Sequence, residues 1–354
     1  MRPATIIHVA ELAKVSLKTV SRVMNNEPNV TTRTREKVMA AVDQLGYTPS
    51  IAARRMGGSK SYLLIAFNDR QLTLENWRSP RGSNWVDQML YGAMQACEAS
   101  GYHLMFELID LQDLQLERRL VSVLSSLKPD GVILTPPNSD NPTVLRALEE
   151  RGVPYVRMGS TLKGGGHAVF MDDILATQVV VRHLLDLGHR RIGFIAGSFR
   201  HLSSLHRVES FITVMADGGI AVPDDWVRRG DFSYESGTLN AEALLDLACP
   251  PTAIIASNDA MALAALHVAQ QRGLNVPGDL SLVSFDDSPG VRFSAPPLTA
   301  VRQPVAEMAG RSVELLIAIV AGVEPEGLEH KLDFELIVRD STGAARPGGA
   351  RALA

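Results

Sequence analysis

Hydrophobic residues recur at helical spacing in the first fifty residues and predict three short helices. Thr5 can cap a first helix of about two turns, and Ser16 is a good N-cap for a second helix over 17–24. A third helix begins near residue 31 or 32 and ends at Gly46. The inward-facing positions of the three helices are Val9, Ala10, Ala13, Val20, Val23, Val38, Ala41, Val42 and Leu45. The pattern indicates a small all-α domain.

From Tyr62 onward the pattern changes, and short β-rich runs alternate with amphipathic helices, for example over 86–99 and 177–187. Such alternation predicts parallel sheets that are covered by helices on both faces. Ligands of such sheets bind at the carboxyl ends of the strands. The candidate strands are Leu63–Phe67, His103–Leu108, Gly131–Thr135, Tyr155–Met158, Arg191–Ala196, Thr252–Ala256 and Leu280–Phe285.

Three segments lie outside both patterns. The linker over 49–60 has room for one or two helical turns, which are marginal alone in water because helix nucleation is costly. We expect it to order only against a partner surface. The segment over 69–84 is expected to be a long loop, mobile in its last part from Arg78, and the Gly/Ala-rich tail over 341–354 is expected to be disordered.

Composition narrows the class of protein. A chain of 354 residues with 45% hydrophobic and 21% charged residues can form more than one well-packed domain. Cys97 and Cys249 have no disulfide or zinc spacing, and both are expected to be buried; no metal and no cofactor are expected. No signal peptide and no membrane-spanning run is recognised, so the protein is expected to be cytoplasmic.

The charge is distributed unevenly along the chain. Residues 1–60 carry ten Lys and Arg against four Asp and Glu, whereas the remaining residues carry 25 basic and 35 acidic side chains. A basic N-terminal region followed by an acidic remainder favours a polyanionic partner for the N-terminal region alone. Aromatic residues make up only 5% of the chain, which argues against a general single-strand binder that stacks bases on many rings.

Residues 9–23 fit a helix-turn-helix. Ala10 and Ala13 are small enough for two helices to cross closely, and Val15 is an apolar turn residue. On the second helix, Lys18 and Arg22 can donate to guanine, while Leu17 can contact a thymine methyl. Polar residues suited to contacts with the DNA backbone are Thr5, Ser16, Thr19, Ser21 and Asn25. The alternative is a generic three-helix bundle with a solvated basic face.

In the larger region, a few polar and aromatic residues stand where a ligand would bind. Asn258 and Asp286 each follow an apolar strand directly, and Arg207 lies in a helical run after another strand. Trp85 and Phe232 are aromatics at strand–helix junctions. Planar polar groups can bind adjacent hydroxyls, and aromatic faces pack on C–H surfaces, so the set suits a sugar. The alternative is that the aromatics belong to the core and Arg207 is ion-paired.

The sequence resembles the lactose-repressor (LacI/GalR) family of bacterial regulators over some three hundred residues. Besides the helix-turn-helix, the matching stretches are Leu45-Gly46-Tyr47-Thr48-Pro49, Ala53-Arg54, Leu187-Gly188-His189-Arg190-Arg191-Ile192-Gly193, Pro251-Thr252-Ala253-Ile254, Asn258-Asp259, Val276-Pro277-Gly278-Asp279-Leu280-Ser281, Phe285-Asp286-Asp287, Pro297-Leu298-Thr299 and Gln303-Pro304. Several spaced motifs in the family's order are far more specific than a lone helix-turn-helix.

The resemblance implies a helix-turn-helix domain over 1–48, a hinge over 49–60 and a periplasmic-binding-protein-like core of two parallel-sheet lobes joined by three crossovers. The lobes would comprise about 61–160 plus 291–322 and about 161–290 plus 323–340. The resemblance also implies a homodimer, or a dimer of dimers, on a roughly palindromic DNA operator, with Arg54 and Met56 of the hinge on the DNA. Three residues depart from the family's pattern. Met56 stands where the family has a leucine, His8 stands where it usually has an acidic residue, and Lys14 stands where a glycine is common.

Matched by motif, Arg207, Phe232, Asn258 and Asp286 fall on the family's effector positions; further candidates are Trp85, Thr135, His201 and Ser203. The resemblance implies a repressor of carbohydrate-utilisation genes that a small sugar-like effector controls allosterically. A purine or nucleoside effector is the alternative. A sugar-binding transport protein would need export, and an enzyme would need a catalytic motif; the glycine run at 164–166 is a poor phosphate-binding loop.

Overall fold

The computed structural model describes residues 4–24, 29–47, 60–78 and 84–346. The chain divides into two compact units, residues 1–62 and 63–354. The proposed hinge contacts at Arg54 and Met56, and the backbone contact at Asn25, lie outside the described residues. No helix in the described part of the chain is both long and apolar enough to span a membrane.

The first unit contains the three predicted helices, α1 (Ile6–Ala13), α2 (Leu17–Met24) and α3 (Thr32–Leu45). The Thr31 side chain caps α3 by accepting the N–H of Thr34, and Gly46 ends the helix with a left-handed backbone, φ 56°. Their small core comprises Val9, Ala10, Ala13, Val20, Val23, Val38, Ala41, Val42 and Tyr47.

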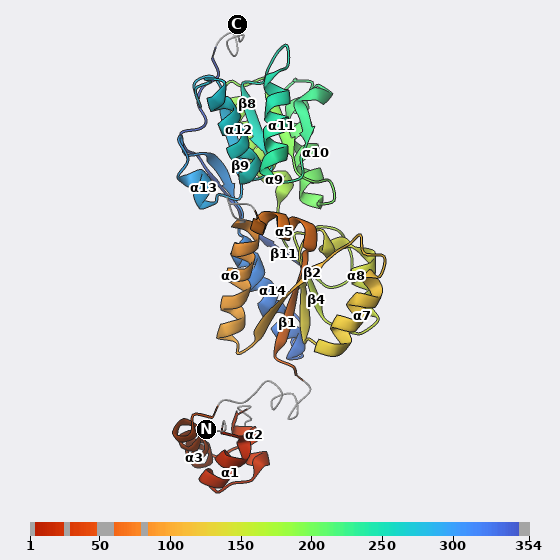
Figure 1. Ribbon diagram of the computed structural model, residues 1–354, viewed down its shortest axis with the longest axis vertical. Helices are drawn as coiled ribbons and strands as arrows, with labels where there is room; N and C mark the ends of the chain where they lie inside the picture. Colours follow the sequence, from red (N-terminus) through yellow and green to blue (C-terminus); the bar gives the residue numbers. More distant parts are fainter. Residues whose placement is uncertain (1–3, 25–28, 48–59, 79–83, 347–354) are drawn as a thin grey trace. The chain divides into compact units, whose positions relative to one another are not determined.

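The second unit has two lobes, each built on a six-stranded sheet (Figure 1). The first-lobe sheet has the order β11-β5-β4-β3-β1-β2, and all of its neighbouring strands run parallel. Its strands are β1 (Leu63–Asp69), β2 (His103–Ile109), β3 (Gly131–Leu134), β4 (Tyr155–Met158), β5 (His167–Met171) and β11 (Glu329–Leu332).

The second-lobe sheet has the order β12-β10-β9-β8-β6-β7 and is parallel apart from the antiparallel pair β10–β12. Its strands are β6 (Ile192–Ala196), β7 (Val227–Arg229), β8 (Ala253–Ala256), β9 (Ser281–Phe285), β10 (Thr299–Arg302) and β12 (Glu335–Ile337). The seven predicted strands are all present, in place to within a few residues.

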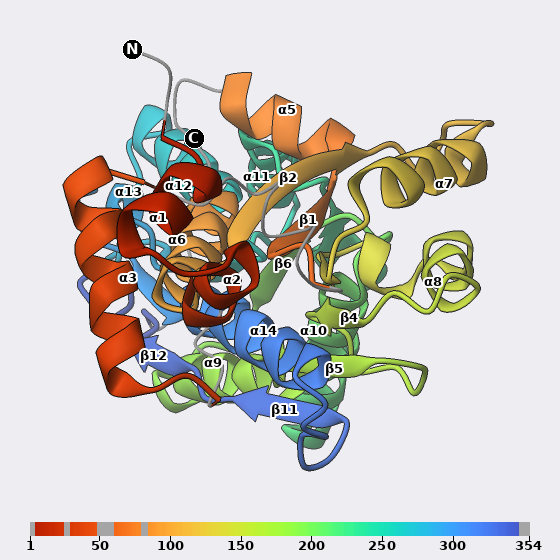
Figure 2. The same ribbon diagram turned by 90° about the horizontal axis from the view of Figure 1, so that it is seen from below.

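Helices cover both faces of each sheet, as the strand–helix alternation predicted (Figures 1 and 2). In the first lobe, α6 (Asn84–Ala99) and α14 (Val305–Val320) pack together on one face. Leu120 of α7 (Leu116–Leu127) and Val144 of α8 (Pro142–Glu149) share the core of the other face. The chain enters α6 through a further helix, α5 (Arg70–Arg78), and η1 (Asn138–Asp140) precedes α8.

In the second lobe, successive residues of β6 show how one strand serves two layers. Phe194 packs on Phe211 of α10 (Leu202–Asp217), with ring centroids 5.1 Å apart, whereas Ile195 faces the core formed with α11 and α12. The remaining elements are α9 (Asp173–Asp186), α11 (Tyr234–Leu245), α12 (Asp259–Gln271), α13 (Pro289–Arg292) and η2 (Asp224–Trp226).

The structure corrects the expected lobe boundaries by about ten residues. β5 and β11 pair within the first-lobe sheet, and β10 pairs within the second-lobe sheet. The chain therefore crosses between the lobes near 172, 303 and 333, which makes the three crossovers that the resemblance implied. The strands that shift the boundaries are short, and β11 has a single apolar residue, Leu332, so the hydrophobic pattern did not reveal them.

Three other expectations were wrong. The segment over 69–84 is not simply a loop, because its first half forms α5. The expected disordered tail is ordered through residue 346: the buried Ser341 accepts the N–H of Thr299, and the Ala345 N–H donates to the Leu187 carbonyl. Residues 347–354 lie outside the described part. Cys97 is buried as expected, whereas Cys249 is exposed.

Candidate functional site

The outer face of α2 carries the residues predicted to read DNA. Val20 and Val23 point into the core, which leaves Leu17 and Lys18 exposed and Arg22 half-buried on the other side of the helix. α2 is strongly amphipathic because its apolar and polar residues segregate at helical spacing. The helix therefore presents a polar, basic face with one exposed leucine.

Hydroxyl groups hold the start of this helix. The Ser16 Oγ accepts the N–H of Thr19 at 3.2 Å, and the Ser16 and Thr19 hydroxyls are hydrogen-bonded at 2.9 Å. Ser16 thus caps α2, as predicted, while Ser21 lies half-buried further along it. At the start of α1, Thr5 is exposed and its backbone N–H donates to the Nδ1 of His8 at 3.2 Å. His8 therefore has a capping role in this helix.

The turn before α2 contains a strained residue. Lys14 adopts the left-handed conformation, with φ 52° and ψ 48°, and ends α1 through N–H bonds to the carbonyls of Ala10 and Glu11. This conformation costs an L-residue with a side chain about 1–2 kcal/mol. It explains why a glycine would suit this position.

A single cavity in the second unit brings together all eight residues predicted to bind an effector. It encloses about 880 Å³ of space, open solvent at its mouth included, which is within the range of small-molecule sites. It lies at the carboxyl ends of β1, β3, β6, β8 and β9. Its lining residues are Asn68, Asp69, Leu72, Thr73, Trp85, Val86, Thr135, Pro136, Gly159, Met171, Asp173, His201, Ser203, Arg207, Phe232, Ser257, Asn258, Asp286, Gln303 and Met308.

Arg207 is both a cavity residue and a partner in a buried ion pair. Its Nε and Nη2 lie 2.7 and 2.6 Å from the Oδ1 of Asp173, and its Nη1 donates to the Ser257 carbonyl at 2.7 Å. The guanidinium also lies over the ring of Phe285, with Cζ 4.0 Å from the centroid. A guanidinium has five N–H groups, so two remain for a ligand in this fixed orientation.

Asp286 is held in an unfavourable backbone conformation at the end of β9. Its φ is 101°, a left-handed value that strains a residue with a side chain, as is common at functional sites. Gln303, from a crossover between the lobes, donates to its Oδ1 at 2.5 Å. Burial and the nearby carboxylate of Asp259 raise the pKa of Asp286 well above its usual range.

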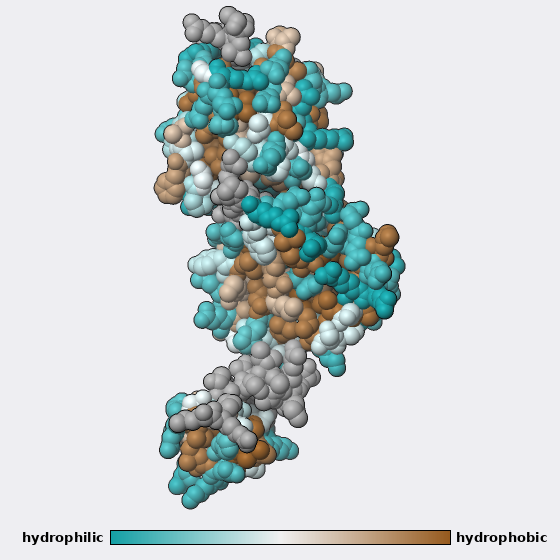
Figure 3. Space-filling view, viewed as in Figure 1, coloured by the Kyte–Doolittle hydropathy of each residue, from teal (hydrophilic) through white to brown (hydrophobic). Residues whose placement is uncertain are grey.

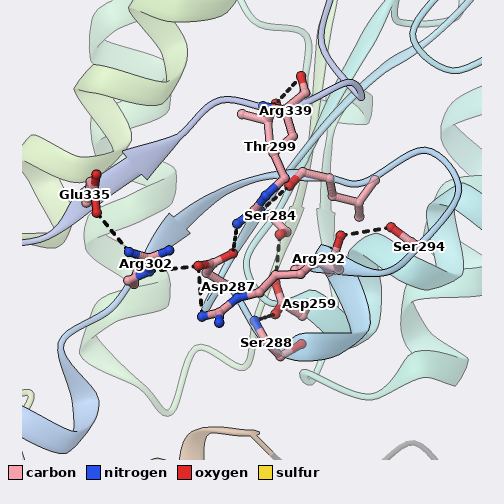
Figure 4. A network of polar contacts seen from close by, with 12 residues as sticks. Asp259, Ser284, Asp287, Ser288, Arg292, Ser294, Thr299, Arg302, Glu335 and Arg339 are labelled. Atoms are coloured by element: carbon pink, nitrogen blue, oxygen red, sulfur yellow. Dashed lines mark hydrogen bonds and ion pairs between the residues drawn. The ribbon is translucent and has the colours of Figure 1, made fainter.

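Two further buried carboxylates, those of Asp287 and Asp259, have their own partners (Figure 4). The fully buried carboxylate of Asp287 contacts three guanidiniums, those of Arg292 at 3.1 Å, Arg302 at 2.8 Å and Arg339 at 2.6 Å. Asp259 accepts hydrogen bonds from the Ser284 hydroxyl at 2.7 Å and from the Ser288 N–H at 2.5 Å. Burial raises the pKa of Asp259 to about 6.

His201 faces the cavity as a neutral imidazole that has no hydrogen-bond partner among the described residues. Both of its ring nitrogens are buried and unpartnered, and its ring meets Phe232 edge-on with centroids 5.1 Å apart. Burial, together with the charges of Arg200 and Arg207, lowers the pKa of His201 to about 4. Phe232 itself has a positive φ of 72° and packs so closely on Gly197 that no side chain fits there.

The other predicted cavity residues are partly used within the protein. Asn258 caps α12 by accepting the Met261 N–H at 3.0 Å and donates to the Phe232 carbonyl at 2.9 Å. The Thr135 hydroxyl lies 2.9 Å from the Oδ1 of Asn68. Trp85 and Ser203 line the cavity from the first turns of α6 and α10.

Sequence reasoning missed several lining residues. Asn68, Asp69 and Ser257 directly follow or end strands that were predicted, so the rule that ligands bind at carboxyl ends of strands could have found them. Leu72 and Thr73 had no such signal, because their helix was interpreted as a loop. In the described residues, no group of three or more His, Cys, Asp or Glu is placed to hold a metal ion.

A helix-turn-helix unit followed by a two-lobed α/β core with a cleft between its sheets defines a class of ligand-controlled DNA-binding regulators. Residues 5–50 match the family model described as bacterial regulatory proteins, lacI family, and residues 181–342 match the periplasmic binding protein-like domain. The chain belongs to the LacI family of transcriptional regulators.

Relatives match over nearly the whole chain. An uncharacterized HTH-type transcriptional regulator in the aml 5′ region of Streptomyces limosus is 38% identical, covering 96% of this chain and 95% of that protein. The HTH-type transcriptional regulator CelR of Thermobifida fusca is 32% identical over 96% of this chain and 98% of its own. The HTH-type transcriptional repressor CytR of Escherichia coli K12 is 31% identical, with coverages of 96% and 97%.

Solved structures agree with this assignment. The complex of the transcriptional regulator CelR with cellobiose has a TM-score of 0.71 at 30% identity, covering 96% of this chain and 99% of that one. The lac repressor dimer bound to operator and the anti-inducer ONPF has a TM-score of 0.80 at 26% identity, with coverages of 97% and 100%.

Proposed function

We propose that this regulator represses carbohydrate-utilisation genes from a roughly palindromic operator and that a neutral sugar in the cavity controls its grip on DNA. The observation that supports this proposal most directly is that the two lobes line the cavity with different kinds of side chain. Similarity to the CelR–cellobiose complex supports a sugar over other small molecules.

The two lobes contribute different chemistry to the cavity. The second lobe supplies polar groups, foremost Arg207, Asn258 and Asp286. All apolar side chains except Phe232 come from the first lobe, and they are Leu72, Trp85, Val86, Pro136, Met171 and Met308. A sugar ring has hydroxyls on its edge and C–H groups on its faces, so it can use both surfaces at once.

The state of His201 favours an uncharged ligand. A neutral imidazole donates from one nitrogen and accepts at the other, which suits hydroxyl groups. The carboxylates of Asp173 and Asp69, which also line the cavity, already neutralise the guanidiniums of Arg207 and Arg200, and this disfavours anions such as sugar phosphates. Both unpartnered nitrogens of His201 would gain partners from a polyhydroxylated ligand.

A nucleoside is the second candidate effector. Trp85 and Phe232 line the same cavity, and a purine or pyrimidine ring could stack on either of them. A nucleoside would present its ribose hydroxyls to the second lobe in the same way as a sugar.

On the DNA side, α2 would lie in the major groove. Lys18 and Arg22 on its outer face would donate to guanine, and the exposed Leu17 would meet a thymine methyl. Thr5, Ser16, Thr19 and Lys14 lie at the starts of α1 and α2 or in the turn between them, where backbone contacts fix the register.

A homodimer would bring two such helices to the two halves of the operator. The first lobe exposes Tyr91 and Met94 on α6, at 56% and 58% of their surface, beside the edge strand β2. Figure 3 shows hydrophobic surface gathered over the first lobe between α6 and α7. An apolar surface of this kind is typical of subunit contacts, and the similar lac repressor structure is a dimer.

The effector would act by linkage. Because the cavity is lined from both lobes, an effector with different affinities for their open and closed arrangements shifts the equilibrium between them. A changed lobe arrangement would change the linker that joins the core to the DNA-binding unit. By reciprocity, operator DNA would change effector affinity by the same factor.

Binding experiments on the full-length protein test this function. An operator would first be selected from random duplexes, and its affinity measured by fluorescence anisotropy with cellobiose, monosaccharides, nucleosides and a sugar phosphate. We expect a neutral sugar to change operator affinity about 5- to 150-fold. Asp286→Asn and Arg207→Lys should keep operator affinity and lose this response, whereas the surface variant Glu314→Gln should keep both.

The outcomes separate the candidates. A response to nucleosides alone would establish the second candidate. A response to the sugar phosphate alone would contradict the role given to His201 and the carboxylates. Absence of any preferred duplex sequence would contradict operator binding itself.

A further inference from the structure

The carboxylate of Asp69 contacts both lobes of the core. Asp69 ends β1 of the first lobe, and only 7% of its side chain is exposed. Its Oδ1 accepts the N–H of Leu72 in the first turn of α5 at 2.7 Å. Its Oδ2 lies 3.4 Å from the Nη2 of Arg200, in the loop that follows β6 of the second lobe.

The helix that Asp69 caps forms part of the cavity wall. Leu72 and the buried Thr73 line the cavity from α5. The other end of the helix is fixed by Trp77, whose ring lies 5.4 Å from the ring of Phe106 on β2. α5 is therefore attached to the first lobe at both ends, on the side that faces the second lobe (Figure 1).

Arg200 extends this contact to the ligand-facing part of the second lobe. It directly precedes His201, whose unpartnered ring nitrogens are buried at the cavity. The Arg200 side chain is 40% exposed. The ion pair thus joins the wall formed by α5 to the loop that carries His201.

We propose that Asp69 and Arg200 form a latch that stabilises the closed arrangement of the lobes around the cavity. When the lobes separate, Asp69 keeps its bond to Leu72 and loses only Arg200, so α5 stays on the first lobe. Because Arg200 is partly exposed, the latch is weak and sensitive to salt. That the enclosed molecule is the effector rests on the proposed function; the latch itself does not.

Distances between spin labels on the two lobes test the latch without any ligand. The full chain would carry Cys249→Ser and one nitroxide at each of two exposed positions, Leu114 before α7 and Leu239 on α11. Dilution with unlabelled protein removes distances between subunits. Asp69→Asn removes the charge but keeps a good helix cap, and Arg200→Gln removes the other charge.

We expect either variant to lower the ratio of closed to open lobe distances about two- to fivefold. Potassium chloride at about 1 M, where screening acts over about 3 Å, should shift the wild type in the same direction and leave the variants unchanged. The double variant should shift no further than either single variant. Arg119→Gln, which removes an ion pair with Glu107 inside the first lobe, is the matched control and should have no effect.

Unchanged lobe distances in both single variants, or an equal shift in Arg119→Gln, would overturn the latch. Hydrogen exchange at the Leu72 N–H checks that α5 remains folded in Asp69→Asn; an opened lobe pair with an unfolded α5 would also overturn it. Because no sugar is present, a wrong effector class leaves this result untouched. Failure of every sugar to bind, with the latch intact, would count only against the proposed function.

Discussion

The imidazole of His201 meets the ring of Phe232 edge-on, with their centroids 5.1 Å apart, and neither ring nitrogen has a partner in the described part of the chain. Phe232 is one of the residues that hold this imidazole at the cavity, where burial and two nearby guanidiniums keep it neutral. The consequence is measurable as a dependence of stability on pH.

His201 should make the core less stable as the pH falls. The pKa of His201 is about 4 in the folded chain and about 6.5 when unfolded, so the unfolded chain binds the extra proton between these values. Relative to His201→Gln, the wild type should therefore lose about 2 kcal/mol of unfolding free energy between pH 7 and pH 5. Urea denaturation of both proteins measures this; equal losses in the two would show that His201 is not the group responsible.

Asp287 should be the most sensitive position of the network in Figure 4. Asp287→Asn leaves Arg292, Arg302 and Arg339 without their shared, fully buried carboxylate. We expect a loss of about 2–3 kcal/mol in the unfolding free energy. Glu314→Gln, which removes an exposed ion pair with Arg311, should change it by less than about 0.5 kcal/mol. Chemical denaturation at neutral pH measures both losses of unfolding free energy. A loss in Asp287→Asn as small as that in Glu314→Gln would refute the role given to Asp287.

Lys14→Gly should separate stability from DNA affinity. A glycine relieves the left-handed strain at this position, so the helices of the first unit should gain up to about 1 kcal/mol, read from native-state hydrogen exchange. Operator affinity should fall, because a positive charge near the DNA backbone is lost. Lys14→Ala should lose the same affinity without the gain in stability. A stability gain from alanine equal to that from glycine would argue against strain.

Arg22 should read sequence, whereas Lys14 should contribute to affinity for any duplex. Arg22→Ala is expected to cost about 1–3 kcal/mol at the selected operator and to relax the preference at one base pair. Anisotropy titrations with the operator, its single-base variants and a random duplex compare the two roles. An equal loss on operator and random DNA would reassign Arg22 to the DNA backbone.

Much of the candidate site was predictable because parallel strands bring their carboxyl ends to one edge. Asn258 and Asp286 each follow an apolar run that could hardly be anything but a buried strand, and their meeting at one cavity follows from that topology. What these side chains already bind was not predictable. The Asn258 amide donates to the Phe232 carbonyl, a residue 26 positions away in the sequence, and no local pattern encodes that contact.

The failures also have physical causes. α5 has few apolar residues, and its start depends on Asp69 as a cap, a role that the sequence alone does not distinguish from that of any acidic loop residue. β11 lies at a sheet edge and consists of three polar residues and one leucine, so its strand character comes from pairing with β5. The boundaries of the lobes depended on such strands, which is why they shifted.

The return of the chain through both sheets at residues 329–346 constrains the order in which a nascent molecule can mature. β11 completes the first-lobe sheet, β12 extends the second, and Ser341 bonds to Leu282 and Thr299 within the second lobe. Neither lobe can reach its final form until the ribosome has passed this stretch, whereas the helices over 6–45 are contiguous and can fold at once. During synthesis the three helices of the DNA-binding unit can therefore fold well before the two-lobed core is complete.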